Sequence, residues 1–303
     1  MNRYLALSRT THAGLDMAAP AFCALLWLGG FPPWQTILLS LLTAFAAYTA
    51  VYALNDIVGL KYDREKFAGS EINPGYSMDA SAQRHPLAQS VLSVRSGMIW
   101  AGAWFAAAVI GSYLLNPVIV LVLLGSTALE VFYCRLLKVT YLRTLLSGLV
   151  KTSGPIAAIL VVDPNPALGR LLLMVAWLFF WEIGGQNIPS DWNDTVEDRR
   201  VDAKTIPLLF GQEHAGRIIV AALALSVIVS AFLPLISPAR FGVPYVVASV
   251  LLGVLLLLRP GLRLYRLKQG ALAARLFESA SYYPLANFAL ISTFLAAQQF
   301  LGV

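Results

Sequence analysis

Two groups of carboxylate and amide side chains stand directly after long apolar stretches. The first group contains Asn55, Asp56 and Asp63. Asp56 and Asp63 are seven residues apart, so on a helix they share one face, about 10 Å apart along the axis. Mg²⁺ takes oxygen ligands and is often held by one or two carboxylates together with substrate phosphates. The spacing therefore indicates a metal and phosphate site, with an ordinary solvated acidic loop as the alternative.

The second group is larger. Its members follow one another at spacings of four, three and four residues: Asn187, Asp191, Asp194 and Asp198. On a continuous helix these side chains fall within an arc of about 60°. Like charges at such spacing repel one another unless a cation lies between them. Pro189 is expected to break or kink this helix. Together the two groups suggest a pair of clamps for metal ions and a diphosphate.

The rest of the chain has the composition of a membrane protein. Of its 303 residues, 58% are hydrophobic and 13% are charged, whereas soluble domains carry roughly 25% charged residues. A membrane-spanning helix needs about 20 mostly apolar residues, and its backbone must be satisfied internally. We predict an all-α polytopic membrane protein, a single domain over residues 1–303. Nine spans are expected at 12–31, 34–54, 96–115, 118–134, 144–162, 169–187, 217–236, 242–258 and 279–301.

Lys and Arg are distributed unevenly about these spans. Of the 22 such residues, only Arg170 and Arg240 fall on the side opposite the N-terminus, and Lys151 lies within a span. Because cytoplasmic loops carry the excess of Lys and Arg, we expect a cytoplasmic N-terminus and a site that opens to the cytoplasmic side of a cell inner membrane. The net charge of +6 follows from this topology and gives no indication of nucleic-acid binding.

These features resemble the UbiA superfamily of intramembrane prenyltransferases. The family carries an NDxxDxxxD motif after its second helix, which corresponds here to Asn55, Asp56 and Asp63. A DxxxD motif after the sixth helix corresponds to Asp191, Asp194 and Asp198. The resemblance covers essentially the whole chain and implies that the nine predicted helices surround a central cavity.

The sequence also departs from the family pattern. Gly59 replaces the middle aspartate of the first motif and removes one candidate metal ligand. His85 stands between Arg84 and Pro86, where the family has an Arg-Pro pair. Asp202 stands where a glycine is common. These differences bear on the subfamily rather than on the superfamily.

The resemblance implies a role for each of these side chains. Mg²⁺ would be the cofactor, and the two polar groups, which contain the motifs, would supply its ligands: Asn55, Asp56, Asp63, Asn187, Asp191, Asp194 and Asp198. The aspartates of both motifs are the expected catalytic residues. Nearby basic side chains would bind the substrate diphosphate: Arg64, Arg84, Arg135, Lys138 and Lys204. For Arg135, Lys138 and the neighbouring Arg143, the positive charge typical of cytoplasmic loops is the alternative explanation.

Several polar residues fall within or beside the predicted spans. Asp16, Glu130 and Glu182 are ionisable residues of this kind, and such residues are often functional. Either glutamate could bind or deprotonate an acceptor. Tyr52 and Asn187 are further candidates for the cavity. The alternative is a structural hydrogen bond to a neighbouring helix or, for the tyrosine, a place in the interfacial aromatic belt.

The predicted reaction is Mg²⁺-dependent transfer of a prenyl chain from a prenyl diphosphate to a small aromatic, quinone-precursor or lipid acceptor within the bilayer, with release of diphosphate. A terpene cyclase of the same superfamily would use the same clamps and capture the carbocation internally. Outside the enzymes, a transporter or a non-catalytic lipid-binding protein is the alternative, although the sequence has no convincing inverted repeat.

Overall fold

Every regular element in the described part of the chain is helical. The computed structural model describes residues 3–67 and 85–301, so Arg84 lies outside the described residues. The elements are α1 (Arg3–Leu7), α2 (Thr10–Asp16), α3 (Ala18–Leu28), α4 (Trp34–Phe67), α5 (Val94–Leu115), α6 (Pro117–Arg135), η1 (Leu136–Lys138), α7 (Arg143–Val162), α8 (Leu168–Trp181), η2 (Glu182–Asn187), α9 (Ile188–Asn193), α10 (Thr195–Arg200), α11 (Ile206–Ser230), η3 (Leu233–Ile236), α12 (Val243–Gly253), η4 (Val254–Leu258), α13 (Arg259–Leu267) and α14 (Gly270–Leu301).

Seven of the helical stretches in the described residues are long and apolar enough to cross a membrane. They overlap the predicted spans from 34–54 to 242–258. The predicted span at 217–236 extends past the end of α11 at Ser230 and into η3. The predicted span at 12–31 is instead a pair of short helices, α2 and α3, which meet at Met17. The span at 279–301 lies inside α14, which is not among the seven. The all-helical, multi-pass character is therefore confirmed, whereas the count of nine stays a prediction.

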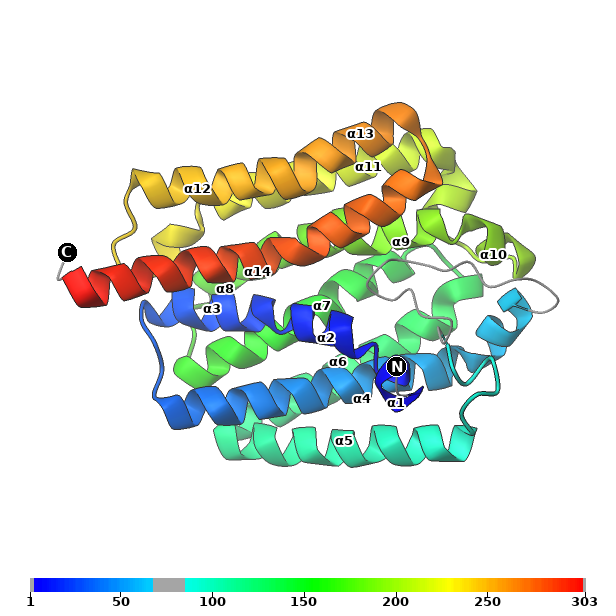
Figure 1. Ribbon diagram of the computed structural model, residues 1–303, viewed down its shortest axis with the longest axis horizontal. Coiled ribbons are helices and arrows are strands. Elements are labelled where there is room, and N and C mark those ends of the chain that lie inside the picture. The colour runs from blue at the N-terminus through cyan, green and yellow to red at the C-terminus, as the bar shows by residue number, and fades with distance from the viewer. Residues whose placement is uncertain (1–2, 68–84, 302–303) are drawn as a thin grey trace.

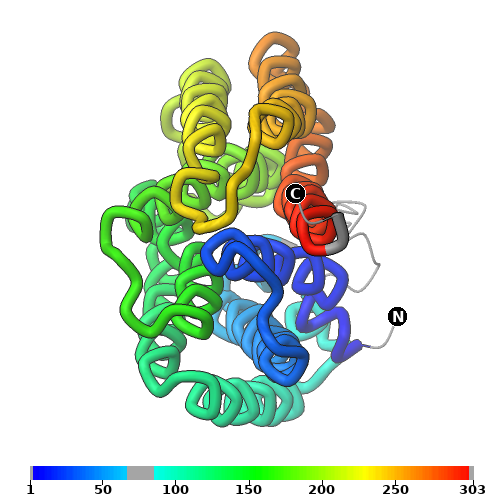
Figure 2. The backbone as a smooth tube through the Cα atoms, turned by 90° about the vertical axis from the view of Figure 1, so that its left-hand side faces the viewer, coloured from blue at the N-terminus to red at the C-terminus, as the bar shows by residue number. Residues whose placement is uncertain are grey.

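The long helices run side by side along the molecule (Figure 1). Helix α4 packs against α5, and α7 packs against both α6 and α3. Seen from the end in Figure 2, the N-terminal helices and α4 to α8, coloured blue to green, form a ring. Helices α11 to α13, yellow to orange, stand outside this ring, and α14 runs along its edge. Helix α4, which carries the first acidic group, is therefore part of this ring.

Polar residues set the ends of several helices. Asn116 accepts a hydrogen bond from the backbone N–H of Val118, and Pro117 occupies the first turn of α6, where its missing N–H costs nothing. Ser93 accepts from the backbone N–H of Ser96 at the start of α5. These are ordinary N-caps.

The segment that carries the second acidic group is irregular. The turn η2 is π-helical, a geometry found mostly as single turns and frequently at functional sites. Pro189 follows in the first turn of α9, and the helix continues to Asn193. The break comes at Asp194, between α9 and α10. Pro189 therefore does not end the helical stretch, which runs from Leu168 to Asn193. The irregularity lies in the π-helical turn directly before it, since proline has no N–H to donate to the preceding turn.

Close packing holds η2 in place. A Cβ atom on Gly185 would lie 2.8 Å from the Cβ of Ala280 on α14, so only glycine permits this approach. Nearby, the indole of Trp181 is buried and donates to the carbonyl of Ala280 at 2.9 Å. Trp177, also buried, donates to the hydroxyl of Tyr283 at 3.2 Å. These contacts hold η2 and the end of α8 against α14.

Candidate active site

A cavity of about 580 Å³ occupies the interior of the ring. Its walls come mainly from α2, α3, α4, α5, α6, η1, α7, η2, α9, α10 and α14. On α4 the lining residues run from Thr36 to Lys66, which is nearly the whole helix. The wall is polar at the end near Lys66 and apolar at the far end, where Leu25, Ile37 and Leu41 contribute. The cavity thus offers a charged mouth and an apolar interior.

The first acidic group forms a compact cluster around an imidazole. Nδ1 of His85 lies 2.7 Å from Oδ1 of Asp56 and 3.1 Å from Oδ2 of Asp63. The three side chains offer ligand atoms that all lie within 4.8 Å of one another. His85 and Asp63 line the cavity directly. The histidine therefore joins two carboxylates that lie two helical turns apart on α4.

His85 is held in an unusual backbone conformation. Its φ is 54°, in the left-handed region that residues other than glycine seldom adopt. Burial alone would lower the pKa of His85, but the negative charges of Asp63 and Asp56 outweigh this effect and raise the pKa above its usual value. The imidazole is therefore favoured in its charged form, as a counter-ion for both aspartates. Such strained positions concentrate at functional sites.

The second acidic group is neutralised by cations from distant helices. Arg143 on α7 donates to Oδ1 of Asp191 at 2.5 Å, and both side chains are buried. Lys66 on α4 lies 2.6 Å from Oδ1 of Asp198 on α10. Asp194 accepts a hydrogen bond from Nδ2 of Asn193 at 3.0 Å. Because Lys66 follows Asp63 by one helical turn, its pair with Asp198 brings the two acidic groups to the same end of the cavity.

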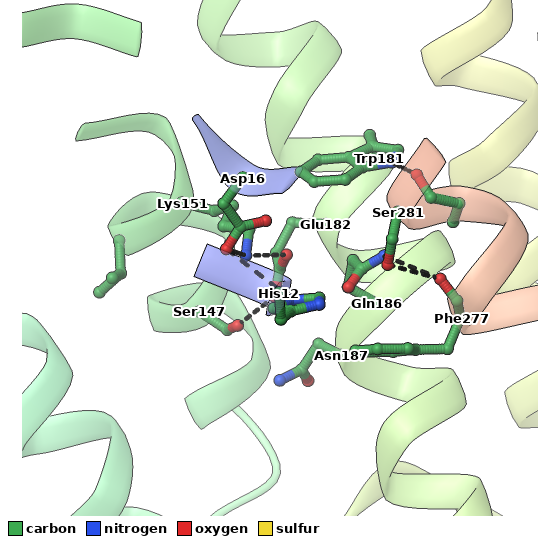
Figure 3. Close-up of polar contacts among 12 residues, drawn as sticks. His12, Asp16, Ser147, Lys151, Trp181, Glu182, Gln186, Asn187, Phe277 and Ser281 are labelled. Atoms are coloured by element: carbon green, nitrogen blue, oxygen red, sulfur yellow. Dashed lines mark hydrogen bonds and ion pairs between the residues drawn. The ribbon is translucent and has the colours of Figure 1, made fainter. Parts of the chain in front are cut away.

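Below this mouth lies a second polar layer, which we call the middle tier. It consists of Asp16, Tyr52, Ser147, Lys151, Glu182 and Gln186, all of which line the cavity. Nζ of Lys151 donates to Oδ2 of Asp16 at 2.7 Å and lies 4.0 Å from Oε2 of Glu182. Tyr52 also donates to Asp16, and Ser147 donates to Oε1 of Glu182 at 2.6 Å. Figure 3 shows Lys151 between the two carboxylates.

The geometry connects the mouth to the middle tier. Arg143, Ser147 and Lys151 recur every four residues on α7, so they lie along one face. Opposite them, Asp191 and Glu182 contact the two ends of that row. On α6, Glu130 accepts from Nδ2 of Asn55 at 2.5 Å. A continuous polar track therefore runs inward from the mouth.

The structure brings many of the predicted site residues together. The cavity lining includes Asp16, Tyr52, Asn55, Asp63, Glu130, Glu182, Asn187, Asp191, Asp194 and Asp198. Asp56 stands just behind the wall and bonds to His85. Among the described residues, four of the predicted diphosphate-binding side chains are not part of the lining: Arg64, Arg135, Lys138 and Lys204. Lys138 instead pairs with Glu65 at 2.6 Å on the exposed side of α4.

The cavity is lined by basic side chains other than these four. They include Lys66, His85, Arg143 and Lys151. Lys151 could have been predicted as a site residue, because an ionisable residue inside an apolar span is often functional. Lys66 could have been found from its spacing, three residues after Asp63 on the same helix. The contacts of His85 could not be predicted from a local pattern, since they join residues 29 and 22 positions apart.

Several buried oxygens at the mouth suit a divalent cation. Oδ2 of Asp56, Oδ2 of Asp191 and Oδ1 of Asn187 have no hydrogen-bond partner among the described residues. Leaving such atoms unsatisfied costs about 1–3 kcal/mol each. Carboxylate and amide oxygens are the ligands that hard cations prefer. The residues present therefore fit a divalent cation at this end of the cavity.

One left-handed residue lies just beyond the second group. Asp202 has a φ of 53°, in the region where glycine has no steric penalty. This explains why a glycine suits the corresponding family position. An aspartate is among the residues that tolerate the conformation best.

Comparison with known proteins agrees with this architecture. The model of the UbiA prenyltransferase family matches residues 17–291. A UbiA homolog from Aeropyrum pernix K1 in its apo form has a TM-score of 0.74 and 20% identity, with 94% of this chain and 98% of that chain covered. A UbiA homolog from Archaeoglobus fulgidus bound to DMAPP and Mg²⁺ has a TM-score of 0.67 and 17% identity, with 96% and 99% covered.

A third solved structure, described in terms of digeranylgeranylglyceryl phosphate synthase in membranes, has a TM-score of 0.65 and 15% identity, with 97% of this chain and 98% of that chain covered. Comparison with the sequences of curated proteins gave no significant match. At these identities the solved structures establish the fold, and the family model establishes the membership. The chain belongs to the UbiA prenyltransferase family and is an all-helical, multi-pass integral membrane protein.

Proposed function

We propose that this protein transfers a prenyl chain from a prenyl diphosphate to an acceptor within the membrane, with release of diphosphate. The observation that carries the proposal is the convergence of both acidic groups at the mouth of one cavity. The relative from Archaeoglobus fulgidus, which is bound to DMAPP and Mg²⁺, supports both the donor class and the cofactor. An apolar interior beyond the mouth is suited to a prenyl chain.

Mg²⁺ is the proposed cofactor, and aspartates of both groups would hold it. The first group offers Asp56 and Asp63, and the second offers Asp191, Asp194 and Asp198. Asn55 and Asn187 remain candidates from the sequence. When bound, the metal neutralises negative charge on the departing diphosphate.

We propose that basic side chains at the mouth bind the diphosphate. Arg143 presents a planar guanidinium suited to phosphate oxygens, and its Nε has no hydrogen-bond partner among the described residues. Lys66 and His85 line the same region. Each already contacts a carboxylate, so each is held in position before the donor arrives. We propose these three in preference to Arg64, Arg135, Lys138 and Lys204, which lie off the cavity wall.

The finer topology is part of the same proposal. We infer nine membrane crossings in a single domain over residues 1–303, with α2 and α3 together forming the first and α14 the last. The N-terminus and the cavity mouth would face the cytoplasm, in a cell inner membrane. The excess of Lys and Arg on that side supports this orientation.

The test uses purified protein in lipid nanodiscs with DMAPP or a longer prenyl diphosphate and Mg²⁺. We expect diphosphate release that EDTA stops. Asp56→Ala and Asp194→Ala should each abolish it, while Glu65→Gln, on the exposed side of α4, serves as the matched control. Unchanged turnover in both aspartate variants would overturn the site assignment.

The same assay separates transfer from cyclisation. Product that forms only when an acceptor is added supports transfer. Cyclic hydrocarbon formed from the donor alone would identify a terpene cyclase. Absence of diphosphate release from every donor tried would favour a transporter or a lipid-binding protein.

A further inference from the structure

The middle tier contains a surplus of hydrogen-bond acceptors. Oε2 of Glu182 and Oε1 of Gln186 are buried and have no hydrogen-bond partner among the described residues. Both side chains line the cavity and come from the π-helical turn η2. Because buried polar atoms in native proteins are nearly always paired, two such oxygens along one turn indicate a ligand that donates hydrogen bonds.

The orientation of these side chains is fixed by their other polar atoms. Oε1 of Glu182 accepts from Ser147 at 2.6 Å. Nε2 of Gln186 donates to the carbonyl of Phe277 at 3.1 Å and to the hydroxyl of Ser281 at 3.0 Å. Figure 3 shows these three contacts. With one polar atom of each side chain anchored to the protein, the other is left for a bound molecule.

The charge of the tier favours a neutral molecule. Two carboxylates, Asp16 and Glu182, stand on either side of Lys151, whose ammonium donates to Asp16 and lies 4.0 Å from Glu182. An anionic ligand would have to compete with both carboxylates for this cation. Like charges that approach one another in a buried site are costly. A hydroxyl group avoids that cost and satisfies the acceptor oxygens.

We propose that the acceptor of the prenyl chain is a neutral, hydroxyl-bearing molecule that binds in the middle tier, with its O–H donated to Oε2 of Glu182. This inference rests on the proposed function, since it names the second substrate of that reaction. The tier lies directly inward of the diphosphate end along α7, so the acceptor would approach the carbon that leaves the diphosphate.

Glu182 then acts as the proton acceptor. The bond between C1 of the prenyl chain and the diphosphate oxygen breaks, and its electron pair leaves with the diphosphate. The hydroxyl oxygen of the acceptor forms the new bond to C1, and its proton passes to Oε2 of Glu182. The products are a prenyl ether, free diphosphate and a protonated carboxyl, which later returns its proton to water.

The first test compares two probes that differ in charge. Protein in nanodiscs receives DMAPP, Mg²⁺ and either 4-hydroxybenzyl alcohol or 4-hydroxybenzoate, and products are measured by mass spectrometry. We expect an ether from the alcohol, with kcat/KM at least about tenfold higher than for the benzoate, which corresponds to ~1.4 kcal/mol. Preference for the benzoate, or no product from the alcohol while diphosphate is still released, would overturn the inference.

The second test removes the proposed base. Glu182→Gln keeps the shape of the side chain and should lower kcat for ether formation by about 100-fold, within the range for general base catalysis. The KM for DMAPP should stay unchanged. Glu182→Asp should recover part of kcat, and Glu65→Gln should behave as the parent protein. A rise in KM for DMAPP with kcat preserved would instead show that Glu182 only supports the fold of the donor site.

The two proposals fail in different ways. If the proposed function is wrong, no prenyl diphosphate releases diphosphate under any condition. If only the acceptor inference is wrong, diphosphate release persists and responds to Asp56→Ala, but the neutral alcohol gives no ether.

Discussion

The two acidic groups at the cavity mouth are neutralised in different ways. The first group is neutralised by one side chain, because Asp56 and Asp63 lie on one helix and share the imidazole of His85. The second draws on distant helices, because Asp191 pairs with Arg143 of α7 and Asp198 pairs with Lys66 of α4. The ion pairs of the second group therefore also connect separate helices. The contacts of the first group connect His85 only to residues of α4. Damage to the second should affect both folding and chemistry, and damage to the first mainly chemistry.

The largest effect is expected from Asp191→Ala. Removing this carboxylate leaves Arg143 buried without its partner, and breaking a buried ion pair costs about 3–5 kcal/mol. Thermal unfolding in detergent should show the loss of stability, and diphosphate release should fall by at least about 100-fold. The double variant Asp191→Ala/Arg143→Met should regain stability without regaining activity. Recovery of activity in the double variant would show that Asp191 serves the fold only.

A smaller, metal-dependent effect is expected from His85→Ala. Without the imidazole, Asp56 and Asp63 lose their shared hydrogen-bond donor, which should cost about 1–3 kcal/mol in EDTA. Mg²⁺ should then supply the missing positive charge, so it should raise the melting temperature more in the variant than in the parent protein. If Mg²⁺ raises it less, the imidazole is itself a metal ligand rather than a counter-ion.

Gly59→Asp restores the carboxylate of the family motif. A Cβ atom there would lie 3.2 Å from Oδ2 of Asp63, so the neighbouring side chain must shift slightly. We expect the added carboxylate to lower the Mg²⁺ concentration needed for half-maximal diphosphate release by several-fold, because extra charged ligands raise cation affinity. An unchanged Mg²⁺ requirement would show that a carboxylate at position 59 does not reach the metal.

The smallest effect is expected from Lys138→Ala. This side chain pairs with Glu65 away from the cavity, and exposed ion pairs contribute little. Diphosphate release should change by less than about twofold, measured beside Arg143→Ala as the cation on the cavity wall. A loss as large as that of Arg143→Ala would support the sequence-based role of Lys138 in diphosphate binding.

Local sequence patterns were sufficient for the helices and for the carboxylates. Long apolar runs predicted the helical, membrane-spanning class, and the seven qualifying helices confirm it. The span at 12–31 was less predictable, because apolar composition alone does not reveal the break at Met17 between α2 and α3. The aspartates were found because regular spacing on one helix is visible in the sequence.

The cations could not be assigned in the same way. Basic residues in cytoplasmic loops are common for topological reasons, so Arg135, Lys138 and Arg143 were equivalent in the sequence. In the structure Arg143 is buried against Asp191, whereas Lys138 lies on the exposed side of α4. Which face of a helix meets the cavity depends on how it packs against its neighbours, and that information is not local.

The sequence by itself determined the helical membrane class, the family and the two acidic groups, because these follow from composition and from short, regular spacings. Only the tertiary structure decided which cation neutralises each carboxylate and that Lys151 stands between Asp16 and Glu182. It also placed His85 between Asp56 and Asp63. These contacts join residues far apart in the chain, and they form only when separate helices pack around one cavity.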